Sequence, residues 1–257
     1  MTLGLKIKIR YPNLICNYHL RILNCFQCLI RKSKIIFIVL FCSQALFWYK
    51  ASMRETEIKK DGIHEYYYKH EYSHQLKWRG HYKKGVKNGV VEIFHWKHGH
   101  LVRREHWING KEQGTWEQFD QDTGRLTTTA SFLDGKQQEA KWFNDNGQLA
   151  IRGRFKDDQQ DGLWEYFDND GHLAYQGNFK NGKEHGLWQG YHQNNQLLYK
   201  GMMNTGEPAG RFEWFYDNGQ LERAGTYYNG RLEGEWHYYD RQGLLTQTTL
   251  YSNGRLI

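Results

Sequence analysis

Three histidines lie close together in the sequence and carry a side chain that metal ions commonly bind. His98 and His100 flank Gly99, and His95 lies three residues before His98. Neutral imidazoles within reach of one another could coordinate an ion such as Zn²⁺. Histidine is frequent throughout His64–His106, however, where it serves as a polar spacer in turns and strands. We therefore predict no metal site. The weak candidates for metal ligands are His95, His98 and His100.

Other residue types that could support catalysis are placed unfavourably. No Gly-x-Ser-x-Gly turn and no phosphate-binding loop occurs. Asp157 and Asp158 lie together in a predicted turn, where Asp is favoured for backbone reasons. All four cysteines lie in the first 42 residues, and the CxxC spacing of Cys25 and Cys28 has no second pair. We predict a protein that is not an enzyme, with no catalytic residue and no cofactor.

Positive charge is concentrated at the N-terminus. Residues 1–52 hold eight of the 35 Lys and Arg residues and no Asp or Glu. The rest of the chain carries 27 basic and 28 acidic side chains, so it is close to neutral. A surface that binds nucleic acid needs a clear basic excess, so we predict no nucleic-acid partner.

The N-terminal residues read as a targeting segment. Residues 1–34 form a basic extension, and a start of translation near Leu29 would exclude most of it. Residues 35–52 include the apolar run Ile35–Phe47 and a small-x-small site that allows cleavage after Ala45. Residues 53–61 are a linker. We expect a cleaved signal peptide that exports the protein to the periplasm or cell envelope.

Three alternatives for this segment remain. It could stay in the inner membrane as an uncleaved anchor, extended by Trp48 and Tyr49. Cys42 could be a lipid-modified cysteine. The product could also be cytosolic and start at Met53. The first two alternatives, like the signal peptide, place the N-terminus with the membrane and the remaining residues outside the cytoplasm.

A period of about 24 residues organises the remainder of the chain. Gly162-Leu163-Trp164 recurs as Gly186-Leu187-Trp188. A fixed period of this length indicates a repeat architecture. The residues that we assign to the repeat framework are Gly162, Trp164, Gly171, Leu173, Gly182, Gly186, Trp188, Gly210, Gly219, Leu221, Gly230, Gly234, Trp236 and Gly243.

Each repeat predicts two β-strands. Aromatic residues alternate with polar ones in Trp164–Phe167, and a turn ending in Gly171 precedes Leu173, which opens the second strand. No apolar pattern has the 3.6-residue period of a helix. We predict an all-β fold over residues 62–257, an elongated single-layer antiparallel meander of about 15 strands in seven units and a fraction. Its glycines form tight turns and let large rings lie over bare backbone.

The pattern of glycine, aromatic and leucine positions, fullest from Gly162 to Gly186 and from Gly210 to Gly234, resembles the MORN-repeat variant. The variant occurs in bacterial proteins named after the YwqK antitoxin. The resemblance implies a single-layer sheet that serves binding or scaffolding, without catalytic residues. It would imply an antitoxin only where a toxin gene lies alongside. MORN repeats are also associated with membranes, which the neutral charge of this region does little to support.

We therefore expect an exported or membrane-anchored, non-enzymatic scaffold that binds a protein partner along its sheet. The first alternative is an antitoxin or immunity protein, in which case the partner is a toxin. The second alternative is binding of an envelope lipid or glycan by exposed aromatic rings.

Overall fold

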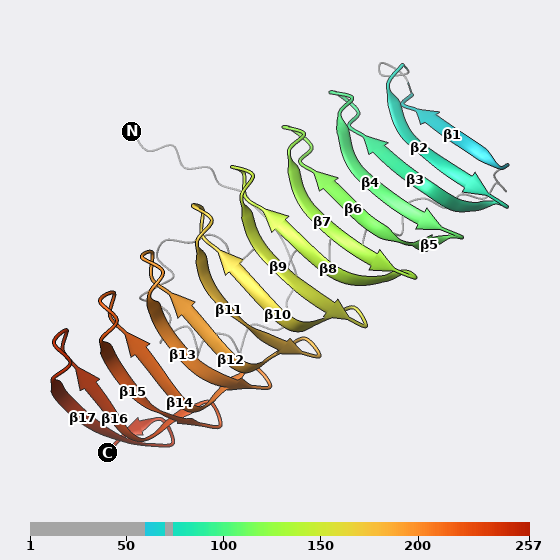
Figure 1. The fold of residues 1–257 in the computed structure, drawn as a ribbon. Helices are drawn as coiled ribbons and strands as arrows, with labels where there is room; N and C mark the ends of the chain where they lie inside the picture. The colour runs from blue at the N-terminus through green and yellow to red at the C-terminus, as the bar shows by residue number, and fades with distance from the viewer. Residues whose placement is uncertain (1–59, 70–73) are drawn as a thin grey trace. The chain divides into compact units, whose positions relative to one another are not determined.

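A computed structural model describes residues 60–69 and 74–257 of the chain. The described residues form one antiparallel sheet (Figure 1), and none of them is helical. The strands are β1 (Gly62–Tyr67), β2 (Leu76–Lys83), β3 (Val86–Phe94), β4 (Leu101–Ile108), β5 (Lys111–Glu112), β6 (Gly114–Phe119), β7 (Leu126–Leu133), β8 (Lys136–Phe143), β9 (Leu149–Lys156), β10 (Gln159–Phe167), β11 (Leu173–Lys180), β12 (Lys183–Tyr191), β13 (Leu197–Asn204), β14 (Glu207–Phe215), β15 (Leu221–Tyr228), β16 (Arg231–Tyr239), β17 (Leu245–Ser252) and β18 (Arg255–Leu256).

The strands follow one another in chain order as a meander, which confirms the predicted fold class (Figure 1). The described part of the chain has 18 strands, more than the predicted 15. One reason is that Gln113 separates β5 from β6, while its backbone N–H donates to the His106 carbonyl. The other reason is that the long strands make eight pairs where the sequence predicted seven, while β18 (Arg255–Leu256) is the fraction of a unit that the prediction already counted.

Two kinds of turn join the strands. Asn181 and Gly182 both have positive φ, 51° and 74°, in the two-residue loop between β11 and β12. That combination defines the tight hairpin turn that Asn-Gly favours. At the other end, the Asp168 carboxylate accepts hydrogen bonds from the backbone N–H groups of Asp170 and His172. Turn chemistry in the sequence therefore sets where each strand ends.

One face of the sheet, here called the aromatic face, carries Trp164 and the other buried rings. Its central row alternates small and large residues: Gly153, Trp164, Gly177, Trp188, Gly201, Phe212, Gly225 and Trp236. Each ring lies over the glycine before it, in space that a β-carbon would need. The indole N–H of Trp164 donates to the Arg154 carbonyl at 3.1 Å. In a single layer, these rings are buried by one another and by bare backbone, and Trp164 is 1% exposed.

The opposite face, here called the ladder face, carries a row with one residue from each long strand. In order, the row is Glu65, Arg79, Glu92, Arg104, Glu117, Thr129, Lys141, Arg152, Glu165, Gln176, Gln189, Lys200, Glu213, Ala224, His237 and Thr248. Charges alternate over its first five positions. Glu92 pairs with Arg79 at 2.6 Å and with Arg104 at 3.3 Å. Opposite charges on adjacent strands favour this register.

The predicted targeting segments lie outside the described residues. These are the extension 1–34, the segment 35–52 with its cleavage site after Ala45, and most of the linker 53–61. The chain divides into two units, Met1–Glu57 and Ile58–Ile257. Among the residues that the structure describes, no helix is long and apolar enough to cross a membrane.

Candidate functional site

The three candidate metal ligands come together in the turn between β3 and β4. The rings of His95 and His98 stack with centroids 5.0 Å apart, and those of His95 and His100 stack at 5.3 Å. His95 Nδ1 accepts a hydrogen bond from the His98 backbone N–H at 3.2 Å. Burial lowers the pKa of His95, and the neighbouring His98 and His100 lower it further. The rings lie face to face, so their packing explains the cluster without an ion.

One group in the described residues brings three potential ligand atoms within 4.8 Å of one another. It consists of Asp168, Asp170 and His172, all in the turn between β10 and β11. The Asp168 carboxylate is already used by the backbone of this turn. These hydrogen bonds account for the group as part of a hairpin turn.

A zinc-protease spacing that the predicted sites did not include occurs at His70-Glu71-Tyr72-Ser73-His74. In zinc enzymes this motif lies on a helix, where residues four apart share one face. Here it falls between antiparallel strands β1 and β2, which are joined by a hydrogen bond from Tyr68 N–H to the Gln75 carbonyl. Residues 70–73 lie outside the described part, and the spacing alone supports no metal site.

A row of tyrosines lies next to the tryptophan row on the aromatic face, and its residue types do not repeat from one unit to the next. Tyr166 and Tyr175 are opposite each other and stack with centroids 4.2 Å apart. Gly190 follows in the row, and the ring of Tyr199 covers it. Burial raises the pKa of Tyr175 to about 12 and also raises those of Tyr166 and Tyr199. These rings are therefore part of the packed face rather than free phenols.

A carboxylate lies on the same face as these tyrosines. Glu184 is opposite Phe179 on the aromatic face. Burial raises the pKa of Glu184 to about 7, and its charge raises the pKa values of Tyr175 and Tyr199 in turn. The neighbouring repeats place Gln160 and Pro208 at the equivalent position. The repeat does not require an acid here, so Glu184 is a position where this unit differs from its neighbours.

Two arginines of the aromatic face occupy equivalent positions in different repeats. Arg103 lies opposite Gln118 in the same row in which Arg223 lies opposite Tyr238. Arg103 forms an ion pair with Glu105, a side chain that is 1% exposed. Glu105 also accepts a hydrogen bond from the Trp107 indole at 2.9 Å. Arg223 instead lies over the ring of Trp214, 4.6 Å from its centroid.

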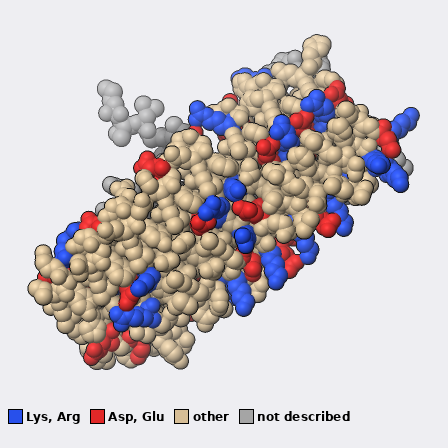
Figure 2. Space-filling view, viewed as in Figure 1, with Lys and Arg blue, Asp and Glu red and all other residues tan. Residues whose placement is uncertain are grey.

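The ladder face carries several exposed apolar side chains, among them Ile63 on β1, Leu250 on β17 and a group of three that is here called the leucine patch: Leu163, Leu187 and Met202. These side chains are 43%, 44% and 48% exposed. Leu187 and Met202 are directly opposite each other on β12 and β13, and Leu163 is on β10. Lys and Arg are interspersed with Asp and Glu on the visible face (Figure 2), with no extended area of one sign. Charge on this part of the chain is therefore mixed, as the sequence indicates.

Cations of the ladder row repeatedly contact a carboxylate and an aromatic ring of the next strand. Lys200 pairs with Glu213 at 2.8 Å and lies over Phe215 at 5.5 Å. Arg152 contacts Glu165 and Phe167 in the same manner. Such charges are neutralised within the sheet, so they are poor sites for a strongly charged ligand.

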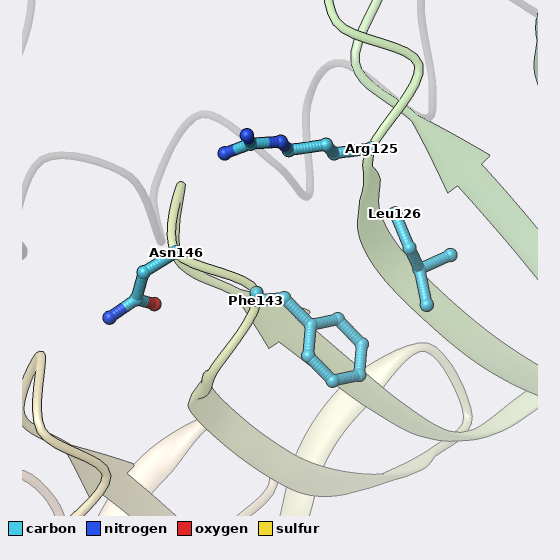
Figure 3. A pocket seen from close by; sticks show the side chains of 5 residues that line it. Arg125, Leu126, Phe143 and Asn146 are labelled. Atoms are coloured by element: carbon cyan, nitrogen blue, oxygen red, sulfur yellow. The ribbon is translucent and has the colours of Figure 1, made fainter.

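A shallow depression of about 370 Å³ lies where two turns approach each other (Figure 3). Arg125, Leu126, Phe143, Asn146 and Gly147 line it. Arg125 donates a hydrogen bond to the Asp145 carbonyl at 2.7 Å, which ties one turn to the next. The depression is open to solvent and holds no cluster of catalytic side chains.

The framework residues assigned from sequence are placed in strands and turns, and Trp164, Trp188 and Trp236 lie in the buried row. Sequence reasoning did not select the strand glycines that these rings cover, although a glycine four residues after the leading leucine recurs in Gly153, Gly177, Gly201 and Gly225. It also missed Glu184 and Arg223. Comparing equivalent positions between repeats would have exposed both as departures.

Comparison with known proteins identifies part of the repeat array. Residues 139–157, 160–181, 184–204 and 209–229 match the family described as MORN repeat variant. These segments cover the strand pairs from β8 to β15, including the unit in which Glu139 replaces the opening glycine. This part of the chain is thus built of MORN-type repeats. No curated protein matches the chain.

Three solved structures show a distant likeness to the chain. A crystal structure of TarM is 18% identical, with a TM-score of 0.24 and coverage of 45% of this chain and 18% of that one. A mutant S. aureus TarM in complex with Fondaparinux, alpha-GlcNAc-glycerol and UDP is 17% identical, with a TM-score of 0.23 and coverage of 47% and 19%. Alternansucrase in complex with isomaltononaose is 19% identical, with a TM-score of 0.14 and coverage of 70% and 16%. The chain spans less than a fifth of each, and these likenesses support no statement about function.

Proposed function

We propose that this repeat protein is a non-enzymatic scaffold that binds a protein partner on the ladder face. The observation that carries the proposal is the leucine patch, in which Leu163, Leu187 and Met202 are each more than 40% exposed. Each lies on the face opposite the buried rings, so none contributes to the packed aromatic rows. Exposed apolar side chains within a polar surround are typical of protein contact sites.

The surround of the patch suits a reversible protein contact. Gln176 and Gln189 are adjacent on β11 and β12 and join through a 3.3 Å hydrogen bond, and Gln176 also donates to the Tyr191 hydroxyl at 2.9 Å. Neutral amides can exchange such bonds with a partner at little cost in charge desolvation. The patch thus has an apolar centre and a polar rim, in which the two glutamines are flanked by Glu165 and Lys200, the arrangement of a modest protein interface.

A capture experiment tests this proposal. The purified chain, and a triple variant with Leu163, Leu187 and Met202 changed to Ser, are used as bait for cell-envelope extracts. The control changes Ile108 and Leu133, exposed apolar residues at turn ends, to Ser. The proposal expects a partner that the wild-type and control proteins retain and the triple variant loses. Equal retention by the triple variant would reject the patch as the contact.

Export of the protein to the cell envelope belongs to the same proposal. The apolar run at residues 35–47 supports export to the envelope, either as a cleaved or an anchored form. N-terminal sequencing of the native product separates these forms: a product beginning at Leu46 supports cleavage after Ala45, and a retained segment supports an anchor.

Two alternative functions give different results. An antitoxin of the YwqK type would make loss of the gene toxic only when a neighbouring toxin gene is intact. A lipid- or glycan-binding protein would sediment with envelope liposomes or polysaccharide in the absence of any protein partner. The near-neutral charge of residues 53–257 favours the protein partner over an anionic lipid surface.

A further inference from the structure

Arg223 is a partly buried cation with no acidic partner among the described residues. Its guanidinium lies against Trp214, and Tyr238 is directly opposite on β16. The Nε atom of Arg223 is buried without a hydrogen-bond partner, and the Nε atom of Arg103 is buried as well, so Nε does not distinguish the two sites. The difference is that an Nη group of Arg103 pairs with a carboxylate, whereas Arg223 forms no ion pair with any described residue.

The equivalent arginine shows what this position binds when the partner is internal. Arg103 in the same row lies over Trp116, 5.6 Å from the ring centroid, as Arg223 lies over Trp214. The carboxylate of Glu105, two residues further along the strand, forms its ion pair. The two sites share an arginine and an indole ring, and they differ in the source of the negative charge.

The repeat that contains Arg223 cannot supply the same carboxylate. Two residues after Arg223 the chain has Gly225, and the Trp236 ring occupies the space of any side chain there. The acidic residues nearest in sequence lie on the other face, because successive side chains of a strand alternate. The three glutamates concerned are Glu213, Glu222 and Glu235. Each is next in sequence to a residue of the aromatic face, so its side chain lies on the ladder face. Glu213 is in addition already paired with Lys200 and Arg211.

We propose that Arg223, with Trp214 and Tyr238 beside it, binds a carboxylate group supplied from outside the chain. A guanidinium presents parallel N–H donors that match the two oxygens of a carboxylate, and the flat indole holds the guanidinium in one orientation. The incoming group pairs with the guanidinium of Arg223 as Glu105 does with Arg103, but it approaches from solvent, because the Trp236 ring covers Gly225. The carboxylate can be the side chain of an acidic peptide segment or a small free acid. This site lies on the opposite face from the leucine patch and does not depend on it.

The direct test follows the side-chain N–H resonances of arginine by NMR in the full-length protein. The Arg223 Nε–H signal is assigned by its absence from Arg223→Lys. Triglutamate, acetate, trilysine and inorganic phosphate are then titrated separately at constant ionic strength. The proposal expects triglutamate to shift the Arg223 signal in a saturable manner and trilysine to leave it unchanged. The Arg103 Nε–H signal should not shift, because the Arg103 guanidinium is already paired with Glu105.

Two variants test the assignment. Arg223→Lys keeps the charge but loses the paired donors, and should weaken triglutamate binding at least tenfold, measured by the change in tryptophan fluorescence. Tyr238→Glu places a carboxylate opposite Arg223 and should abolish binding. Arg103→Lys is the matched control and should bind triglutamate as the wild type does.

The possible results separate clearly. A shift with acetate but not triglutamate supports the carboxylate site and identifies a small acid as its ligand. A shift with phosphate but with neither carboxylate overturns the assignment, and so does the absence of any shift in the wild-type protein. Unchanged affinity of the Arg223→Lys protein also overturns it. Because the leucine patch is intact in these variants, loss of triglutamate binding would leave capture of the protein partner unaffected.

Discussion

The ring of Trp188 lies on Gly177, directly opposite it on the neighbouring strand, in the space that a β-carbon would need. The same contact joins Trp164 to Gly153 and Phe212 to Gly201. Large rings are therefore buried in a fold that has no second layer to cover them. The glycine is required by the ring rather than by backbone conformation, because Gly177 is not among the residues with positive φ.

Replacing one of these glycines should destabilise the sheet strongly. Gly177→Ala adds a methyl group where the Trp188 ring lies, and overpacking of this kind costs about 1–3 kcal/mol. Chemical denaturation followed by tryptophan fluorescence measures the loss. Asn178→Ala, next to it but exposed, is the control and should change stability by less than about 0.5 kcal/mol. An equal effect of the two substitutions would contradict the packing role of Gly177.

Removing a ring should have a local effect on hydrogen exchange. Trp188→Ala empties a site contacted by Tyr166 and Phe179 and should cost about 3–5 kcal/mol. Each repeat contacts only its neighbours, so protection should fall in β11–β13 and persist in β2–β4. Uniform loss of protection over the whole sheet would show instead that the array unfolds as one unit.

Glu92 should contribute to stability against acid. Burial acts to raise its pKa, but hydrogen bonds from Arg79 and Arg104 outweigh this and lower it below the ordinary value. Its stabilising contribution is therefore present above the unfolded-state pKa and is lost as the pH falls through the folded-state pKa. Glu92→Gln should make the free energy of unfolding less dependent on pH below about 4.5. The change in that free energy should be less than about 1 kcal/mol, because the ion pairs of Glu92 are partly exposed. Denaturation at pH 3 and pH 6 tests the difference, with Glu235→Gln as control.

The repeat framework could be predicted because its causes are local. Asn181-Gly182 specifies a tight turn wherever it occurs, and an aromatic two residues after a glycine indicates the ring row. The charged ladder could not be predicted in this way. Glu65, Arg79 and Glu92 are 13 or 14 residues apart in the chain, and only the strand register brings them side by side.

The departures from the repeat were harder still to interpret. In the sequence, Arg103 is followed two residues later by Glu105 and Arg223 by Gly225, but this difference does not by itself show a contact. Their difference depends on whether a carboxylate reaches the guanidinium, which is a property of side-chain packing. The separation of β5 from β6 at Gln113 likewise depends on one backbone hydrogen bond to His106. No residue pattern in the sequence predicts that bond.

Glu184 should destabilise the protein at neutral and basic pH. Its pKa is about 7 in the folded chain, against an ordinary value of 4.5, because burial disfavours the charged form. The folded state thus holds the proton more tightly than the unfolded state. Stability contributed by this group is full below pH 4.5 and declines as the pH rises to about 7, by about 3 kcal/mol in all.

Glu184→Gln keeps the size of the side chain and removes its charge. The variant should therefore match the wild-type protein in stability at pH 4 and exceed it by up to about 3 kcal/mol at pH 8. Urea denaturation at the two pH values measures this difference, and Glu235→Gln, which carries an exposed carboxylate, should show none of it. A Glu184→Gln protein that is less stable than the wild type at pH 8 would mean that the Glu184 charge has a stabilising partner in the folded chain, and the destabilising role assigned to it here would be wrong.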